Sequence, residues 1–203
     1  MEMGKTIAKK ALFIAFEGID GCGKSTALSL VASKIVAAHR EVVFTHEPTD
    51  GPIGQKIYNI LFGRELMIAP RELQKLFIQD RKEHIVKEIL PALQKDVVLL
   101  SDRYWLSTIA YGMLTEPIDV FTKLHEEILG TAFIKPDITF ILDLPAETAM
   151  ERLGKSSHEL DFFEKAETQK KIRENYLAIT RAGLDNVRVV DATAAAEETA
   201  ESI

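Results

Sequence analysis

The chain has 203 residues, a formal net charge of −6 at pH 7, and 46% apolar and 28% charged residues. These values are typical of one soluble globular domain with a large core. The negative charge argues against a protein that coats nucleic acid, because phosphate backbones bind basic surfaces. Cys22 is the single cysteine, and no apolar run approaches the ~20 residues that span a membrane. We therefore expect an intracellular, cytoplasmic protein without a disulfide and without a membrane partner.

Residues 18–25 read G-I-D-G-C-G-K-S and fit the phosphate-loop pattern G-x-x-x-x-G-K-[ST]. An apolar run leads into this stretch and a helical pattern leaves it, which is the context that the motif requires. Glycines let successive N–H groups turn inward, and the following helix adds the positive end of its dipole. We expect Lys24 to reach the β- and γ-phosphates of a nucleotide and Ser25 to hold Mg²⁺. The loop positions are Gly18, Ile19, Asp20, Gly21, Cys22, Gly23, Lys24, Ser25 and Thr26.

Five apolar runs rich in β-branched residues recur along the chain, and helical patterns separate them. Strands that alternate with helices predict an α/β fold, in which right-handed crossovers place helices on both faces of a parallel sheet. Ligands bind such sheets beyond the carboxyl ends of the strands, so the residues after each run are candidate site residues. The runs are 11–16, 42–45, 97–101, 138–142 and 187–190.

Polar residues follow the second and third runs. The loop H-E-P-T-D-G-P-I-G after the second run is irregular, and its place favours a ligand role for Glu47 or Thr49. Asp102 follows the third run and is placed to hold Mg²⁺ or its waters, while Arg103 offers a planar fork for a second phosphate. An ordinary connector and a surface Asp–Arg pair are the open alternatives.

Residues 70–94 carry one long helical pattern that begins at Pro70 and has an apolar stripe. Phe77 and Arg81 are four residues apart and share a face of this helix. Judged from the residues alone, the simpler interpretation is that Phe77 belongs to the core and Arg81 is a solvated charge.

A short polar stretch follows the fourth run and its helix. It carries Lys155, with Arg152 just upstream. A cationic loop that folds over a triphosphate would exclude water and offset charge, which phosphoryl transfer needs. A solvated connector between helices explains these charges equally well.

Several of these stretches together resemble the thymidylate kinases of the P-loop nucleoside-monophosphate kinase superfamily. The likeness spans about residues 11–192, and the combination of motifs is more specific than the phosphate loop alone. The resemblance implies a single three-layer P-loop kinase domain over residues 1–203, with a five-stranded parallel sheet and a short lid at about 153–163. The motifs are F-E-G-I-D-G-C-G-K-S-T, L-F-I-Q-D-R, D-R-Y-x-x-S-x-x-A-Y, P-D-I-T-F-I-L-D-L-P and a D-x-x-E at 161–164.

The resemblance also implies a reaction, in which ATP with Mg²⁺ phosphorylates dTMP to dTDP, and a homodimer. Phe77 would stack on thymine, Arg81 would bond a thymine carbonyl oxygen, and Arg103 would grip the acceptor phosphate. The other acceptor-site positions would be Asp20, Glu47, Thr108, Tyr111 and Phe163, with Arg152 over the adenine of ATP. The transfer step would use Lys24, Arg103, Asp20 and Lys155.

Three positions depart from the family pattern. Cys22 stands where some relatives have an arginine, so that Lys155, with Arg152, would supply the missing charge. His46 replaces the arginine of R-E-P-G-G, and Gly112 replaces the glutamine of A-Y-Q.

Two other functions are the alternatives. A kinase for dUMP or thymidine is one, and with thymidine Glu47 would act as a base on an alcohol. The phosphate of dTMP, with a second pKa of about 6, is largely a dianion and needs no base. A GTPase switch is the other alternative, but it needs N-K-x-D, and the chain has no Asn-Lys pair.

Overall fold

The structure is a computed structural model, and it describes residues 11–154 and 166–203. The five apolar runs form one parallel sheet in the strand order β2-β3-β1-β4-β5. This arrangement confirms the predicted α/β fold. The strands are β1 (Leu12–Glu17), β2 (Glu41–His46), β3 (Val97–Asp102), β4 (Ile138–Asp143) and β5 (Val187–Asp191).

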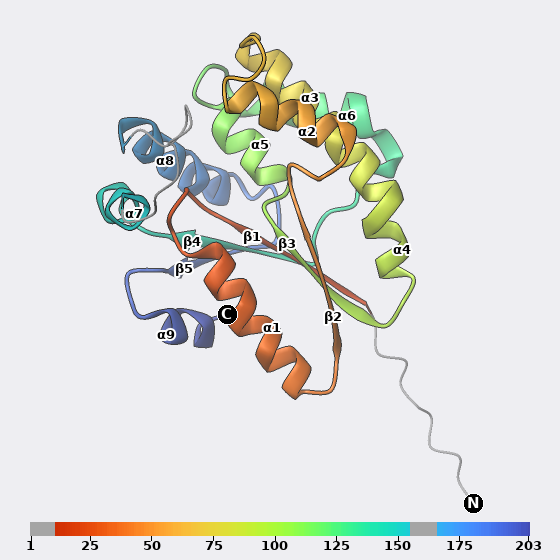
Figure 1. The fold of residues 1–203 in the computed structure, drawn as a ribbon, viewed down its shortest axis with the longest axis vertical. Helices are drawn as coiled ribbons and strands as arrows, with labels where there is room; N and C mark the ends of the chain where they lie inside the picture. Colours follow the sequence, from red (N-terminus) through yellow and green to blue (C-terminus); the bar gives the residue numbers. More distant parts are fainter. Residues whose placement is uncertain (1–10, 155–165) are drawn as a thin grey trace, which may run out of the picture.

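Helices cover both faces of the sheet, which gives three layers. In Figure 1, α1 and α9 lie below the sheet, while α3, α5 and α8 lie above it. The helices α2 and α6 pack on α3 rather than on the sheet. The helices are α1 (Lys24–Ala37), α2 (Pro52–Leu61), α3 (Pro70–His84), α4 (Leu90–Leu93), α5 (Trp105–Gly112), α6 (Ile118–Leu129), α7 (Ala146–Leu153), α8 (Ala166–Ala182) and α9 (Ala196–Glu201), with a 3₁₀ turn at Gly130–Ala132.

The single helix predicted for residues 70–94 is interrupted. A π-helical turn, Ile85–Ile89, joins α3 to α4. The cause is Pro91, which has no N–H for the helical ladder and whose ring would clash with the carbonyl of Lys87 in a regular α-helix. The predicted apolar stripe also ends early, because Leu90 is 39% exposed.

The core explains why the central strands are uninterrupted apolar runs. β1 and β3 are buried along almost their whole length, because helices cover both of their faces. Each fully buried Leu, Ile or Phe side chain in this core stabilises the fold by about 1.5–3 kcal/mol. A smaller cluster under α2 and α3 contains Ile57, Ile60 and Leu73.

The parallel topology places all five carboxyl strand ends at one edge of the sheet. β1 leads there into the phosphate loop, β2 into Glu47, and β3 ends at Asp102. β4 and β5 end on the paired residues Asp143 and Asp191. Among the helices of residues 11–154 and 166–203, none has both the length and the apolar character of a membrane span.

Candidate active site

Two glycines of the phosphate loop combine a positive φ with a lack of room for a Cβ atom. Gly18 has a φ of 138° and Gly21 a φ of 78°. A Cβ atom would lie 2.7 Å from the carbonyl oxygen of Leu142 at the first position, and 2.5 Å from that of Ala149 at the second. The loop therefore packs tightly against β4 and α7, and a side chain at either glycine would displace it.

Lys24 reaches back over this loop. Its Nζ donates hydrogen bonds to the carbonyl oxygens of Ile19 at 3.0 Å and Gly18 at 3.3 Å. The ammonium group is thus held by carbonyl groups of the loop itself, and its contact with phosphates stays a prediction. Cys22 is 1% exposed and packs under the loop, so this position offers no side chain to a phosphate.

Ser25 and Asp102, the two residues predicted to hold Mg²⁺, lie together. The Ser25 hydroxyl donates to Oδ2 of Asp102 at 3.1 Å. Within the described ranges, no three His, Cys, Asp or Glu side chains gather as metal ligands. Mg²⁺ commonly takes only one or two protein ligands and completes its shell with water and phosphate oxygens. A hydroxyl beside a carboxylate, at the mouth of a phosphate loop, fits that ion.

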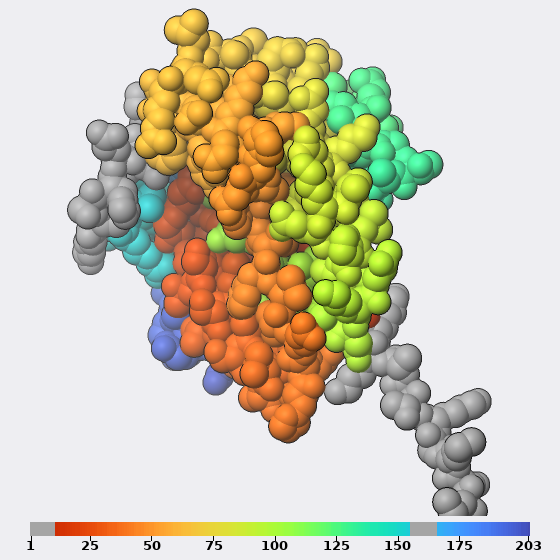
Figure 2. Space-filling model, turned by 45° about the vertical axis from the view of Figure 1, so that its right-hand side comes forward, coloured from red at the N-terminus to blue at the C-terminus, as the bar shows by residue number. Residues whose placement is uncertain are grey.

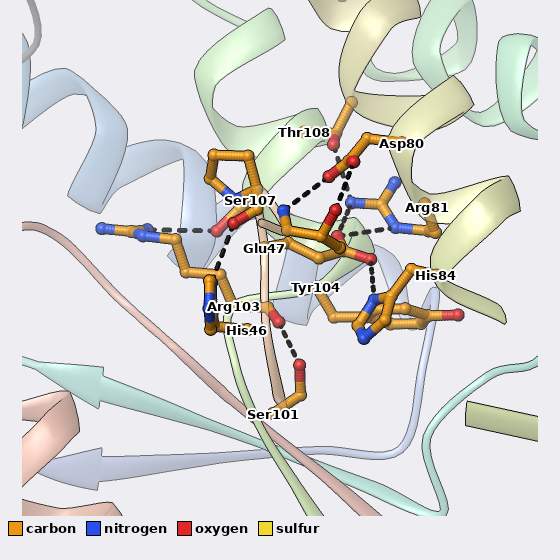
Figure 3. A network of polar contacts seen from close by, with 12 residues as sticks. His46, Glu47, Asp80, Arg81, His84, Ser101, Arg103, Tyr104, Ser107 and Thr108 are labelled. Carbon is orange, nitrogen blue, oxygen red and sulfur yellow. Dashed lines mark hydrogen bonds and ion pairs between the residues drawn. The ribbon is translucent and has the colours of Figure 1, made fainter. Parts of the chain in front are cut away.

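Arg103 adopts a backbone conformation that is rare for a residue with a side chain, with a φ of 66°. Its guanidinium group donates to the Ser107 hydroxyl at 3.1 Å (Figure 3). It also forms an ion pair with Asp20. The Tyr111 hydroxyl donates to Asp20 at 3.0 Å. Burial raises the pKa of Asp20, but the charges of Arg103 and Lys24 outweigh it and hold that pKa below its ordinary value.

Glu17 is a site residue that the sequence analysis did not single out. It is fully buried at the end of β1. It accepts hydrogen bonds from the backbone N–H groups of Tyr104 and Ser107, at 2.9 and 3.1 Å, and from the Tyr176 hydroxyl at 2.9 Å. This carboxylate therefore ties the phosphate loop to the N-terminus of α5 and to Arg103.

We expect Glu17 to make stability depend on pH. Burial raises the pKa of Glu17 above 4.5, so folding shifts this group toward its neutral form relative to the unfolded chain. Its contribution to stability is present below pH 4.5 and is lost as the pH rises through the raised pKa. Urea unfolding at pH 5 and pH 8 should show that Glu17→Gln loses less stability on this rise than the wild type. The exposed control Glu127→Gln should behave as the wild type, and an unchanged pH dependence in Glu17→Gln would contradict the assignment.

Arg81 is buried, with 1% exposure, so the interpretation as a solvated charge is wrong. Its Nε donates to Oε2 of Glu47 at 3.0 Å, and its Nη2 donates to the Thr108 hydroxyl at 3.0 Å (Figure 3). Glu47 Oε1 accepts from Nδ1 of His84 at 2.9 Å. Both carboxylate oxygens of Glu47 thus face cationic or N–H groups, which compensates the burial of its charge.

His125 completes the cage around Arg81. The Arg81 Nη1 lies 2.7 Å from Nε2 of His125, and since a guanidinium group only donates, that ring nitrogen accepts. The Nδ1–H then donates to the carbonyl oxygen of Phe121 at 2.7 Å. Burial, aided by the charge of Arg81, lowers the pKa of His125 to about 3, which keeps the ring neutral.

A pair of variants tests this positioning role of His125. His125→Gln can keep an acceptor near the Nε2 position, whereas His125→Leu leaves a buried Arg81 donor unpaired. We expect His125→Leu to lose about 1.5–3 kcal/mol of stability and to bind the acceptor substrate less tightly, and His125→Gln to recover most of both. Thermal unfolding and acceptor titration measure these effects. Equal behaviour of the two variants would contradict the role.

The structure also describes a cavity that these residues share. It has a volume of about 490 Å³. The half-buried Phe77 forms part of its wall, so it is not a fully enclosed core residue. In Figure 2 the surface is hollowed between α1 and the segment after β2, with residues that follow β3 visible in the depth. The predicted site residues on its wall are Asp20, Gly21, Lys24, Ser25, Glu47, Phe77, Arg81, Asp102, Arg103, Thr108 and Tyr111.

A second cavity of about 510 Å³ lies on the other side of the phosphate loop. Arg152 lines it, and its Nη2 donates to the Ala192 carbonyl oxygen at 3.4 Å. The small side chains of residues 194–196, which follow β5, also line it. The sequence analysis did not single out this alanine-rich stretch, although its place after the fifth strand was a usable signal.

Two predicted site residues and the lid fall outside the residues that the structure describes. Lys155 and Phe163 lie there, as do the D-x-x-E motif and most of the lid stretch 153–163. Thr49, the other candidate after β2, is committed to Asp80, to which its backbone N–H and its hydroxyl donate at 2.8 and 2.7 Å.

The structure shows the surroundings of His46 and Gly112, two of the positions that depart from the family pattern. His46 lines the first cavity, and its Nδ1 lies 2.8 Å from the carbonyl oxygen of Pro48. A Cβ atom at Gly112 would lie 2.5 Å from the Phe121 ring. The ring therefore occupies the space in which a glutamine side chain would begin.

Comparisons with known proteins agree with this geometry. The model of the family described as thymidylate kinase matches residues 16–203. The chain is 37% identical to a thymidylate kinase of Syntrophus aciditrophicus, over 91% of this chain and 88% of that protein. It is 36% identical to a probable thymidylate kinase of Thermococcus onnurineus, over 92% of each, and 35% identical to a thymidylate kinase of Leifsonia xyli, over 96% and 93%. The chain belongs to the thymidylate kinase family.

Proposed function

We propose that this protein transfers the γ-phosphate of ATP to dTMP, giving ADP and dTDP. The observation that carries the proposal is that the two cavities share Gly21, Lys24 and Ser25. One cavity is lined by the phosphate loop and Arg152, and the other by Phe77, Arg81 and Arg103. Two nucleotides bound in them would bring their phosphates together at the same cation.

The acceptor would lie in the first cavity, with its base toward α3. Phe77 offers a ring face for stacking, and Arg81 would donate to a carbonyl oxygen of the base through the Nη1–H that is not bonded to His125. Arg103 would exchange its ion pair with Asp20 for the acceptor phosphate. The cationic charge there offsets the repulsion between two polyanions, which is the main obstacle to the reaction.

The donor would lie in the second cavity, with its adenine beside Arg152 and residues 194–196. The loop N–H groups and Lys24 would hold the phosphates, and Ser25 with Asp102 would hold Mg²⁺. That ion, when bound, neutralises charge on the β- and γ-phosphates. An oxygen of the dTMP phosphate then bonds to the γ-phosphorus as the bond to ADP breaks.

The network around Glu47 weighs against thymidine as the acceptor. An alcohol acceptor needs a base, whereas both oxygens of Glu47 are engaged by Arg81 and His84. A phosphate monoester needs no base, because it is already a dianion near pH 7. For dUMP no such argument applies, so it stays the alternative acceptor.

An acceptor panel tests the proposal directly. ATP and Mg²⁺ are combined in turn with dTMP, dUMP, dCMP and thymidine, and ADP release is followed by a coupled assay. We expect dTMP to have the highest kcat/KM. Activity on thymidine without activity on dTMP would refute the proposal, and a preference for dUMP would select the alternative.

Three further features stay proposals. They are the homodimer, the cytoplasmic location, and the single domain of residues 1–203 with a lid at about 153–163. Val86 and Leu90 support a dimer surface, because both are exposed apolar residues. They lie about one turn apart on the outer side of the helical segment that runs from α3 to α4. Light scattering of the purified chain measures its mass in solution, and a monomer at micromolar concentration would refute the homodimer.

A further inference from the structure

Gln74 is a buried polar side chain in the wall of the first cavity. It lies on α3 and is 3% exposed. Its Oε1 has no hydrogen-bond partner, and of the described residues that line this cavity, no other has a buried side-chain N or O atom in that condition. Buried amide oxygens are nearly always paired in folded proteins, because leaving one unpaired is unfavourable. An exception inside a binding cavity indicates a partner that arrives with the ligand.

The position of Gln74 indicates which part of the ligand it meets. Gln74, Phe77 and Arg81 are spaced by three and four residues, so they lie on one face of α3. The latter two are the residues proposed to stack on the base and to donate to its carbonyl oxygen. Gln74 therefore belongs to the end of the cavity that would hold the base, and not to the phosphate end at Lys24.

One group of the base needs a hydrogen-bond acceptor, and the charged side chains near the base end of the cavity are engaged elsewhere. Thymine presents an N3–H donor between two carbonyl oxygens. Arg81 can only donate, and Glu47 is committed to Arg81 and His84. Asp80, on the same helix, accepts from the backbone and the hydroxyl of Thr49. Gln74 Oε1 is a buried acceptor that has no such commitment.

We propose that Gln74 is a specificity residue for the base, and that its Oε1 accepts a hydrogen bond from the N3–H of a thymine or uracil ring. The inference rests on the proposed function and extends it to a residue that reads the base edge. An acceptor at this place favours rings that carry hydrogen on N3. It disfavours cytosine, whose N3 is itself an acceptor. The family pattern has a glutamine after Tyr111, but this chain has Gly112 there. Gln74 supplies a side-chain amide from α3 instead.

The test compares Gln74→Met, which keeps the length of the side chain without its amide, with the control Gln79→Met on the exposed side of α3. Calorimetry measures Kd for dTMP, dCMP and ATP. We expect Gln74→Met to weaken dTMP binding about tenfold or more, because the N3–H is left unpaired. Its Kd for dCMP and ATP should stay within about twofold of the wild type, and the control should change none of the three.

Thermal unfolding of the ligand-free proteins distinguishes a ligand-binding role of Gln74 from a structural role, because the two roles predict different changes in Tm. If the Gln74 amide oxygen is paired only when a ligand is bound, Gln74→Met removes an unpaired buried oxygen and leaves Tm equal or higher. If the amide instead supports the fold, Tm falls. Gln74→Leu repeats the comparison should the Met variant be poorly folded. A lowered Tm with unchanged dTMP affinity would overturn the inference.

Other outcomes separate this inference from the proposed function. Equal losses for dTMP and dCMP would mean that Gln74 acts on the sugar or phosphate, which overturns the reading of the base. A wild-type protein that phosphorylates dTMP, together with a Gln74→Met variant that binds it normally, would overturn only the inference. A wild-type protein that neither binds nor phosphorylates dTMP would refute the proposed function itself.

Discussion

Lys24→Ala should abolish phosphoryl transfer while leaving the fold intact. Lys24 Nζ lies at the mouth of the phosphate loop, and both cavities reach it. Its charge would stabilise the transferring phosphate in the transition state, where a single missing donor costs about 10²–10³-fold in kcat. A missing full charge at this place should cost at least that much. Steady-state ADP release measures kcat, and circular dichroism with thermal unfolding reports the fold.

The matched control for Lys24 lies on the same helix. Lys34 is exposed at the other end of α1, where its Nζ donates to the carbonyl oxygen of Ala200. Lys34→Ala should keep the wild-type kcat. The phosphate-loop assignment fails if Lys24→Ala keeps its kcat, or if it loses activity only because the protein no longer folds.

Arg81→Ala should have the second largest effect, and it should act on both stability and acceptor binding. Removing Arg81 leaves the buried carboxylate of Glu47 bonded to the His84 ring but without the guanidinium charge that compensates it. Breaking a buried ion pair from one side typically costs about 3–5 kcal/mol. The variant also loses the donors for the base carbonyl, so KM for dTMP should rise at least tenfold while KM for ATP changes little.

The double variant Arg81→Met/Glu47→Gln separates these two effects. It removes both charges, so it should recover stability relative to Arg81→Ala without recovering dTMP binding. The exposed Arg71, which pairs with Glu116 at the surface, supplies the control Arg71→Ala on the same helix. Equal increases in KM for dTMP and ATP would remove Arg81 from the base pocket.

Two halves of the site differed in how well the sequence could predict them. The phosphate loop is contiguous, and its glycines, lysine and serine act within eight residues, so a local pattern suffices. The pocket for the acceptor is assembled from β2, α3, α5 and α6. Its contacts join residues 27 to 44 positions apart, such as Arg81 with Thr108 and with His125. No local periodicity distinguishes such an arginine from one in solvent, and only the family resemblance singled it out.

Several residues could not have been identified from local patterns for the same reason. Glu17 reads as the last residue of a strand, and only its contacts with Tyr104, Ser107 and Tyr176, which lie 87 to 159 positions away, show it as an anchor. His84 and His125 read as scattered histidines on helices. The contacts of these three residues follow from packing, which composition and periodicity do not encode one residue at a time. The π-helical turn at Ile85–Ile89 is different, because Pro91 is a local signal that a regular helix is interrupted there.

The sequence by itself determined the parallel sheet, the phosphate loop and the edge at which ligands bind. Uninterrupted apolar runs can be satisfied only by strands that are covered on both faces, and glycines with positive φ permit a backbone that other residues exclude. The tertiary structure alone decided that Arg81 is caged by Glu47, Thr108 and His125, and that the Oε1 of Gln74, seven residues earlier on the same helix, is left unpaired. Hydrogen bonding in a buried pocket depends on which distant side chains meet there, and that is known only once the layers have packed.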